Sequence, residues 1–183
     1  MRNLIITTGI SGCGKTALSH YICNRYENST LISMDTLKED IYDIFINLLE
    51  ECMRRNDKNI VIEYPFNKNW QPKFEKLVKQ YDYKAIFIKI KRKDFNELFK
   101  KLEMRNNSEK RQPSHVLSCY HLAKKDSYKS INELDYETLK SIYETNKYTL
   151  ISVGKEFGKE YSLINDNFDY RELINEIDSV LND

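Results

Sequence analysis

The sequence lacks the features that mark several common classes of protein. Its four cysteines, Cys13, Cys23, Cys52 and Cys119, are scattered, with no Cys-x-x-Cys pair and no spacing typical of a zinc site. No apolar run approaches the length needed to cross a membrane, and the chain enters its first predicted strand without a signal peptide. We therefore expect a protein of the reducing cytoplasm with no membrane partner.

An excess of charge of one sign is also missing. The chain has 29 Lys and Arg residues against 28 Asp and Glu residues, a net charge of +1. This balance argues against a general nucleic-acid-binding surface, although a local basic groove stays open. A length of 183 residues, 40% of them apolar, predicts a single domain over residues 1–183 with one buried core.

Residues 9–16 read Gly-Ile-Ser-Gly-Cys-Gly-Lys-Thr, which is a glycine, four free positions and then Gly-Lys-Thr. In this pattern the glycines let backbone N–H groups approach phosphate oxygens, which a Cβ would prevent. Lys15 supplies positive charge for the outer phosphates, and the Thr16 hydroxyl is a ligand for Mg²⁺. An apolar run at 3–8 precedes the motif and helical periodicity follows it, so the motif lies between a strand and a helix.

The motif therefore predicts a nucleoside triphosphate site, with Thr16 as the metal ligand. The predicted nucleotide-binding residues are Gly9, Ser11, Gly12, Cys13, Gly14, Lys15, Thr16 and Ala17. Cys13 is interpreted as a tolerated loop residue rather than a redox switch.

Apolar runs alternate with helical periodicity along the rest of the chain. The further predicted strands cover 30–34, 59–63, 85–90 and 161–165, with a β-like run at 148–153, and the further predicted helices cover 37–52, 71–81, 95–105, 114–125, 132–146 and 173–181. This pattern indicates an α/β fold with a parallel sheet covered by helices on both faces. In such sheets ligands bind beyond the carboxyl ends of the strands, where this chain has Asp35, Glu63, Asn165 and Asp166.

Other motifs narrow the class of nucleotide-binding protein. The chain has no Asn-Lys-x-Asp tetrapeptide to read guanine, which disfavours a GTPase. Its third strand ends in Glu-Tyr-Pro rather than a paired Asp-Glu, and the chain is short for an AAA+ motor. A small-molecule or nucleotide kinase remains.

Four stretches in order, at residues 9–16, 34–38, 62–66 and 105–116, resemble the small P-loop kinases. The closest resemblance is to the group that contains the kinase domain of phage-type polynucleotide 5′-hydroxyl kinase, chloramphenicol phosphotransferase and zeta toxins. It covers most of residues 1–125. The resemblance implies a P-loop NTPase three-layer sandwich with strand order 2-3-1-4-5, and ATP with Mg²⁺ as phosphoryl donor. In several members an aspartate that matches Asp35 is the general base.

Two departures from that group concern the acceptor. Polynucleotide kinases have an arginine where this chain has Lys38, and an Asp-Thr-Asn where it has Glu63-Tyr64-Pro65. The identity of the substrate therefore does not transfer. We expect Asp35, Lys38 and Glu63 to contact the acceptor.

Several side chains have more than one interpretation. Asp35 is expected to accept the proton of an attacking hydroxyl, and an aspartate there also suits a helix cap. Glu63 contacts Mg²⁺ through water, binds the acceptor or is a solvated strand end. Arg105 and Arg111 bracket a polar, aperiodic loop at 106–113, which predicts a mobile lid over about 105–115. Arginines in a lid neutralise charge on the transferred group; Arg105 is favoured, and Arg111 is also consistent with surface charge.

The sequence thus predicts an ATP-dependent kinase that transfers the γ-phosphate to a hydroxyl or phosphate of a small molecule, nucleoside or nucleotide. The expected catalytic residues are Lys15, Asp35, Arg105 and Arg111. Asn165 and Asp166 are expected at the edge of the adenine. The alternatives are a 5′-hydroxyl polynucleotide kinase and a nucleotide-binding regulatory module without catalysis.

Overall fold

The computed structural model describes residues 2–9, 12–33, 41–63, 71–108, 136–137, 140, 144, 158–166 and 169–181. In chain order the elements are β1 (Arg2–Gly9), α1 (Lys15–Arg25), β2 (Ser29–Ser33), α2 (Ile41–Arg54), β3 (Asn59–Glu63), α3 (Gln71–Gln80), β4 (Tyr83–Lys91), α4 (Phe95–Ser108), β5 (Gly158–Ile164) and α7 (Arg171–Leu181). Within the described part of the chain, no helix has both the length and the apolar character that crossing a membrane requires.

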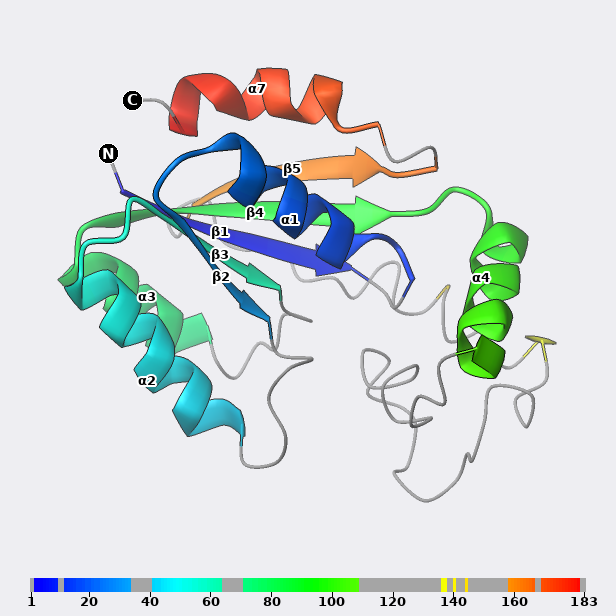
Figure 1. The fold of residues 1–183 in the computed structure, drawn as a ribbon, viewed down its shortest axis with the longest axis horizontal. Helices are drawn as coiled ribbons and strands as arrows, with labels where there is room; N and C mark the ends of the chain where they lie inside the picture. The colour runs from blue at the N-terminus through cyan, green and yellow to red at the C-terminus, as the bar shows by residue number, and fades with distance from the viewer. Residues whose placement is uncertain are drawn as a thin grey trace.

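The described strands form one five-stranded sheet in the order β2-β3-β1-β4-β5, and every neighbouring pair is parallel. Their arrowheads all point toward the same side of the molecule (Figure 1). The α/β fold class and the strand order that the resemblance implied are therefore confirmed. Because the strands run the same way, their carboxyl ends share one edge of the sheet, which we call the carboxyl edge.

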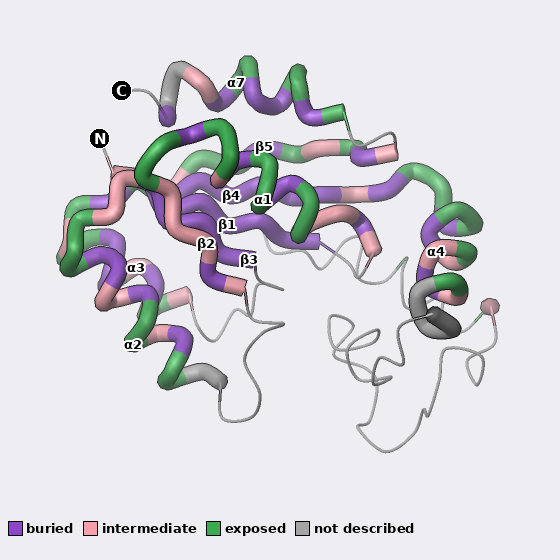
Figure 2. The backbone as a smooth tube through the Cα atoms, in the orientation of Figure 1, coloured by how far each residue is buried: buried purple, intermediate pink, exposed green. Residues whose placement is uncertain are grey.

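Helices cover both faces of the sheet. α1 and α7 lie on one face, and α2 and α3 lie on the other (Figure 1). Ile5 of β1 packs in one buried cluster with Leu18 of α1 and Ile174 of α7, whereas Ile6 packs in a second cluster with Phe45 of α2. The central strands are buried along most of their length, but β5 at the edge is mostly exposed or half-buried, and Tyr161 is its one buried residue (Figure 2). This difference is expected between covered and edge strands.

Three turns that lead from a helix to the next strand contain a residue in the left-handed conformation. Asn28 after α1, Asn56 after α2 and Asp82 after α3 have φ values of 56°, 62° and 54°. Asn and Asp tolerate this conformation better than other residues with a side chain. The chain therefore makes these tight returns with Asn or Asp in place of glycine.

Most predicted boundaries agree with the structure to within a few residues, but the end of α4 is a correction. The helix was predicted to end at about Arg105 and the lid loop to start at Asn106, whereas α4 continues to Ser108. No glycine or proline between these positions stops the helix. β5 also differs, since it begins at Gly158 rather than Tyr161.

Several predicted segments lie outside the described residues. These are the helix at 114–125, most of the helix at 132–146, the β-like run at 148–153 and residues 109–115 of the lid.

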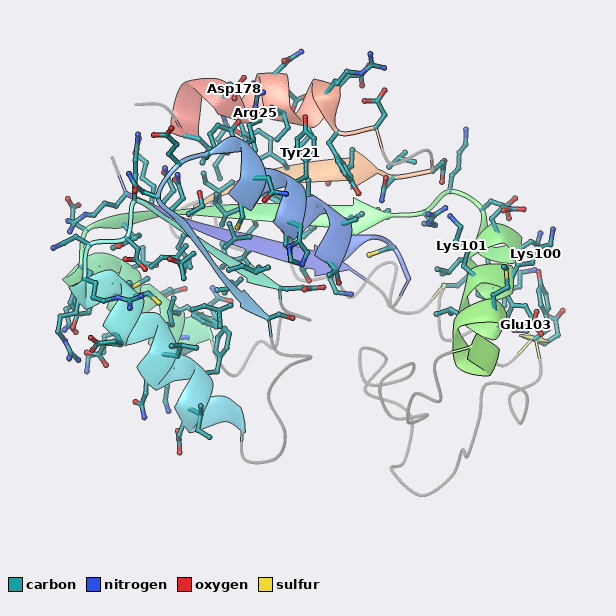
Figure 3. The ribbon with its side chains drawn as sticks, in the orientation of Figure 1. Tyr21, Arg25, Lys100, Lys101, Glu103 and Asp178 are labelled. Atoms are coloured by element: carbon teal, nitrogen blue, oxygen red, sulfur yellow. The ribbon has the colours of Figure 1, made fainter. Side chains whose placement is uncertain are left out.

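Polar contacts join the C-terminal end of α1 to α7. Arg25 Nη2 donates a hydrogen bond to Asp178 Oδ2 at 3.0 Å, and the Tyr26 hydroxyl donates to Asp178 Oδ1. Figure 3 shows Arg25 and Asp178 next to each other between the two helices. Burial, together with the bond to Asp178, raises the pKa of Tyr26 to about 12. The bonds from Tyr26 and Arg25 lower the pKa of the Asp178 carboxyl.

The Tyr26–Asp178 contact predicts both a stability loss and a pH dependence. Tyr26→Phe is expected to lower the free energy of unfolding by about 1 kcal/mol in urea at pH 7, because one hydrogen bond is lost.

Asp178 has a lowered pKa in the folded state. Its contribution to the free energy of unfolding is therefore present above about pH 4, the pKa of an aspartate in an unfolded chain, and is lost as the pH falls through the folded-state pKa. The difference between the wild type and Asp178→Asn should therefore shrink below about pH 4; a difference that stays constant down to about pH 3 would contradict this account.

Candidate functional site

The loop between β1 and α1 contains two glycines in the left-handed conformation. Gly12 and Gly14 have φ values of 78° and 103°, a region that residues with a side chain rarely adopt. Gly14 is the N-cap residue of α1, and no described side chain caps the helix there. The first N–H groups of α1 need acceptors outside the helix, and together with the positive end of the helix dipole they favour an anion at this loop.

Two glycines also let the loop pack closely on its neighbours. A Cβ at Gly9 would lie 2.5 Å from the carbonyl oxygen of Ile90 in β4. A Cβ at Gly12 would lie 2.9 Å from Leu98 Cδ1 and 3.2 Å from Leu102 Cδ2 in α4. A side chain at either position would clash, so the sequence needs glycine where the loop meets β4 and α4.

A buried hydrogen bond ties the loop to the residue that follows β5. Asn165 is 1% exposed, and its Nδ2 donates to the carbonyl oxygen of Cys13 at 2.8 Å. The Cys13 side chain is completely buried, and this burial raises the pKa of its thiol. Such a thiol is protonated and shielded, which supports the interpretation of Cys13 as a loop residue rather than a redox switch.

The segment after β5 is also joined to the turn between β4 and α4. The Lys93 backbone N–H donates to Asp166 Oδ1 at 3.1 Å, and Arg92 Nη1 lies 3.5 Å from the Asp166 carbonyl oxygen. Arg92 is 4% exposed, so a guanidinium group is buried close to the loop. Asp166, predicted at the adenine edge, thus joins the segment after β5 to the turn between β4 and α4.

Hydrogen bonds at the carboxyl edge join the Glu63 carboxylate to two hydroxyls and the Lys15 amine to the glycine loop. Glu63, at the end of β3, is 5% exposed. The Thr16 hydroxyl donates to Glu63 Oε1, and the Ser33 hydroxyl donates to Glu63 Oε2 at 3.1 Å. Lys15 Nζ donates to the carbonyl oxygen of Gly9 at 3.0 Å. An amine, a hydroxyl and a carboxylate therefore lie together beside the N-terminus of α1.

Most of the described residues that the sequence predicted for the site are brought together here. They are Gly9, Gly12, Cys13, Gly14, Lys15, Thr16 and Ala17 in the loop and first turn of α1, and Glu63 in β3. Ser11, Asp35, Lys38 and Arg111 lie outside the described residues, as does the side chain of Arg105, whose backbone is in α4.

The sequence did not predict the contacts that two residues of the site make. Asn165 was expected beside adenine through backbone groups, but its side chain holds the loop. Ser33 was not singled out, although it contacts Glu63. The only local signal for either is a polar side chain at the end of a parallel strand.

The N-terminal part of α4 packs through one apolar face. Leu98 and Leu102 face Gly12 and Cys13 in one buried cluster. Tyr136 packs against the same cluster: its ring centroid lies 5.2 Å from that of Phe95, and its hydroxyl donates to Asn96 Oδ1. α4 is thus fixed to the loop by apolar contacts.

No protein-family model matches the sequence. A search of curated proteins also finds no match. Solved structures do match the fold. A protein from Chloroflexus aurantiacus J-10-fl, provisionally described as a kinase, aligns with a TM-score of 0.68 at 14% identity over 97% of each chain. Kti12 from Chaetomium thermophilum, solved with ADP-AlF3, aligns with a TM-score of 0.57 at 14% identity over 97% of this chain and 98% of Kti12.

The tunicamycin resistance protein of Deinococcus radiodurans aligns with a TM-score of 0.54 at 10% identity over 99% of this chain and 96% of that protein. At such identities the similarity concerns the fold. The expected resemblance to P-loop kinases is confirmed at that level.

The Asn165–Cys13 hydrogen bond predicts that two substitutions of Asn165 lower the free energy of unfolding by different amounts. Asn165→Ala leaves a buried carbonyl without its donor and should lower the free energy of unfolding by about 1–3 kcal/mol. Asn165→Asp is closer in size but sets a buried carboxylate against that carbonyl, so it should destabilise the protein more. Urea denaturation at pH 7 measures both, with Asn175→Ala on the exposed side of α7 as the control. An Asn165→Asp protein as stable as the wild type would contradict the assignment.

Proposed function

We propose that this chain, which has the fold of the P-loop kinases, is an ATP-dependent kinase that transfers the γ-phosphate to a hydroxyl or phosphate of a small molecule, nucleoside or nucleotide. The observation that carries the proposal is the meeting of Lys15, Thr16 and Glu63 around a glycine loop at the N-terminus of α1. The similar Kti12 structure contains ADP-AlF3, which supports a nucleotide-binding role for this fold.

The loop has the chemistry to hold a triphosphate. Phosphate oxygens accept hydrogen bonds from successive backbone N–H groups, and the left-handed glycines let such groups turn toward one anion. Lys15 Nζ already lies against the loop through its bond to Gly9, so its charge is positioned for the outer phosphates. Phosphoryl transfer depends mainly on this kind of positioning and charge neutralisation.

Thr16 and Glu63 supply the oxygen atoms that Mg²⁺ prefers, so the residues present fit this ion. When bound, Mg²⁺ neutralises charge on the phosphate oxygens. We infer that the Thr16 hydroxyl holds the ion directly and that Glu63 acts through water and through its bond to Thr16. That bond favours the metal side over the acceptor side for Glu63.

The acceptor side of the proposal rests on residues that follow β2. Asp35 comes two residues after Ser33, the last residue of β2, which lies beside Glu63 in the sheet. We infer that Asp35 accepts the proton of the attacking hydroxyl as that oxygen bonds to the γ-phosphorus and ADP leaves. Lys38 would contact the acceptor, and Arg105 and Arg111 would neutralise charge on the transferred group.

Lys15→Ala tests the nucleotide site directly. Loss of a charged donor to the phosphates should weaken ADP binding about tenfold to hundredfold, because hydrogen bonds to charged groups contribute about 1.5–3 kcal/mol. Calorimetric titration with ADP measures the change. Lys84→Ala, at the exposed opposite end of the sheet, serves as a matched control and should bind like the wild type. Equal affinity of Lys15→Ala and wild type would remove the basis of the proposal.

Asp35→Asn separates catalysis from binding. This variant should bind ATP normally but lose about a hundredfold to ten-thousandfold in transfer rate, the usual contribution of a general base. Transfer is followed with γ-labelled ATP and a panel of hydroxyl and phosphate acceptors that includes nucleosides, nucleotides and 5′-hydroxyl oligonucleotides. Label on the oligonucleotide alone would identify a polynucleotide kinase. If ATP binds but no acceptor is labelled, and Asp35→Asn changes no measured property, the result favours a nucleotide-binding regulatory module without catalysis.

A further inference from the structure

Ser33 and Glu63 end two neighbouring strands at the same level of the sheet. β2 pairs with β3 in parallel, and the register places Ser33 opposite Glu63, which in turn lies opposite Thr7 of β1. The Ser33 hydroxyl donates to Glu63 Oε2 at 3.1 Å. The other carboxylate oxygen, Oε1, accepts from Thr16. One carboxylate is therefore held by hydroxyls from two different elements, β2 and α1.

The two hydroxyls fix how the carboxylate is turned. A carboxylate end group rotates broadly when nothing holds it. Each of its oxygens has room for more than one donor, so a bond to each oxygen sets the orientation and leaves acceptor capacity for water or a cation. Glu63 is 5% exposed, so bulk water replaces a lost donor poorly. Without the Ser33 hydroxyl, the carboxylate would no longer be kept in line with Thr16.

We propose that Ser33 is a positioning residue for the metal-ion side of the site: it orients Glu63 and through Glu63 the Thr16 hydroxyl that holds Mg²⁺. This inference rests on the proposed function, because it takes Thr16 as the metal ligand. Groups that orient a metal ligand typically contribute tenfold to hundredfold to metal affinity. Ser33 thereby links β2, which leads to Asp35, to the ion that neutralises the phosphates.

The effect of Mg²⁺ on ADP affinity is the readout, since it needs no acceptor. ADP binding is titrated at a series of Mg²⁺ concentrations for the wild type, Ser33→Ala and Ser33→Thr. Ser33→Ala should bind ADP without metal as the wild type does, within about twofold, but should need about tenfold more Mg²⁺ for the half-maximal gain in affinity. Ser33→Thr keeps the hydroxyl and should restore the wild-type value. Ser162→Ala, an exposed serine of β5, is the matched control.

A double variant separates positioning from general support of the fold. If Ser33 acts through Glu63, then Ser33→Ala combined with Glu63→Gln should need no more Mg²⁺ than Glu63→Gln alone. Additive effects would overturn the inference, and so would Ser33→Ala with the wild-type Mg²⁺ dependence. In both cases the proposed function stands. If the ADP affinity of the wild type does not change with Mg²⁺ concentration, both the inference and the metal part of the proposed function are overturned.

Discussion

The pairing of β1 with β3 on one side and β4 on the other positions the glycine loop relative to Glu63 and to the end of β4. In this register Thr7 lies opposite Glu63, and Gly9 lies opposite Ile90. Glu63 points to the face that α1 covers, where it meets Thr16. A slip of β3 by one residue would turn every side chain of the strand to the other face. Ile62 would then take the place under α1, and a carboxylate would enter the apolar layer under α2 and α3.

Two buried hydroxyls near the carboxyl edge are tolerated because they bind each other. The Thr7 hydroxyl lies 2.8 Å from the Ser19 hydroxyl of α1, and both side chains are completely buried. An unpaired polar group at such a depth would cost about 1–3 kcal/mol. At its other end, α1 is joined to α7 through Asp178. α1 is thus held to the sheet near its middle and to α7 at its end, which fixes where Lys15 and Thr16 begin the helix.

Local patterns were enough to predict the glycine loop, the strands and the helices of the described chain, because apolar periodicity and glycine spacing are properties of short segments. Local patterns could not predict the contacts between segments that are distant in the sequence. Asn165 contacts Cys13 across 152 residues of sequence, and it does so only because β5 lies beside β4 and β4 beside β1. Ser33 gains its role in the same way, from the parallel register of β2 with β3. The length of α4 was wrong because polarity at 106–108 was read as a loop, although nothing in those residues stops a helix.

The packing of α4 constrains how the predicted lid can work. Leu98 and Leu102 are completely buried against the glycine loop, and burying one such side chain contributes about 1.5–3 kcal/mol. Moving α4 away from the loop would expose both leucines together with the apolar surface of Cys13. The start of the helix therefore moves with the loop, not independently of it. Arg105 follows Leu102 by three residues, so any closure of the lid that brings Arg105 or Arg111 toward a nucleotide must bend the chain after Leu102, in the last turns of α4 or beyond Ser108.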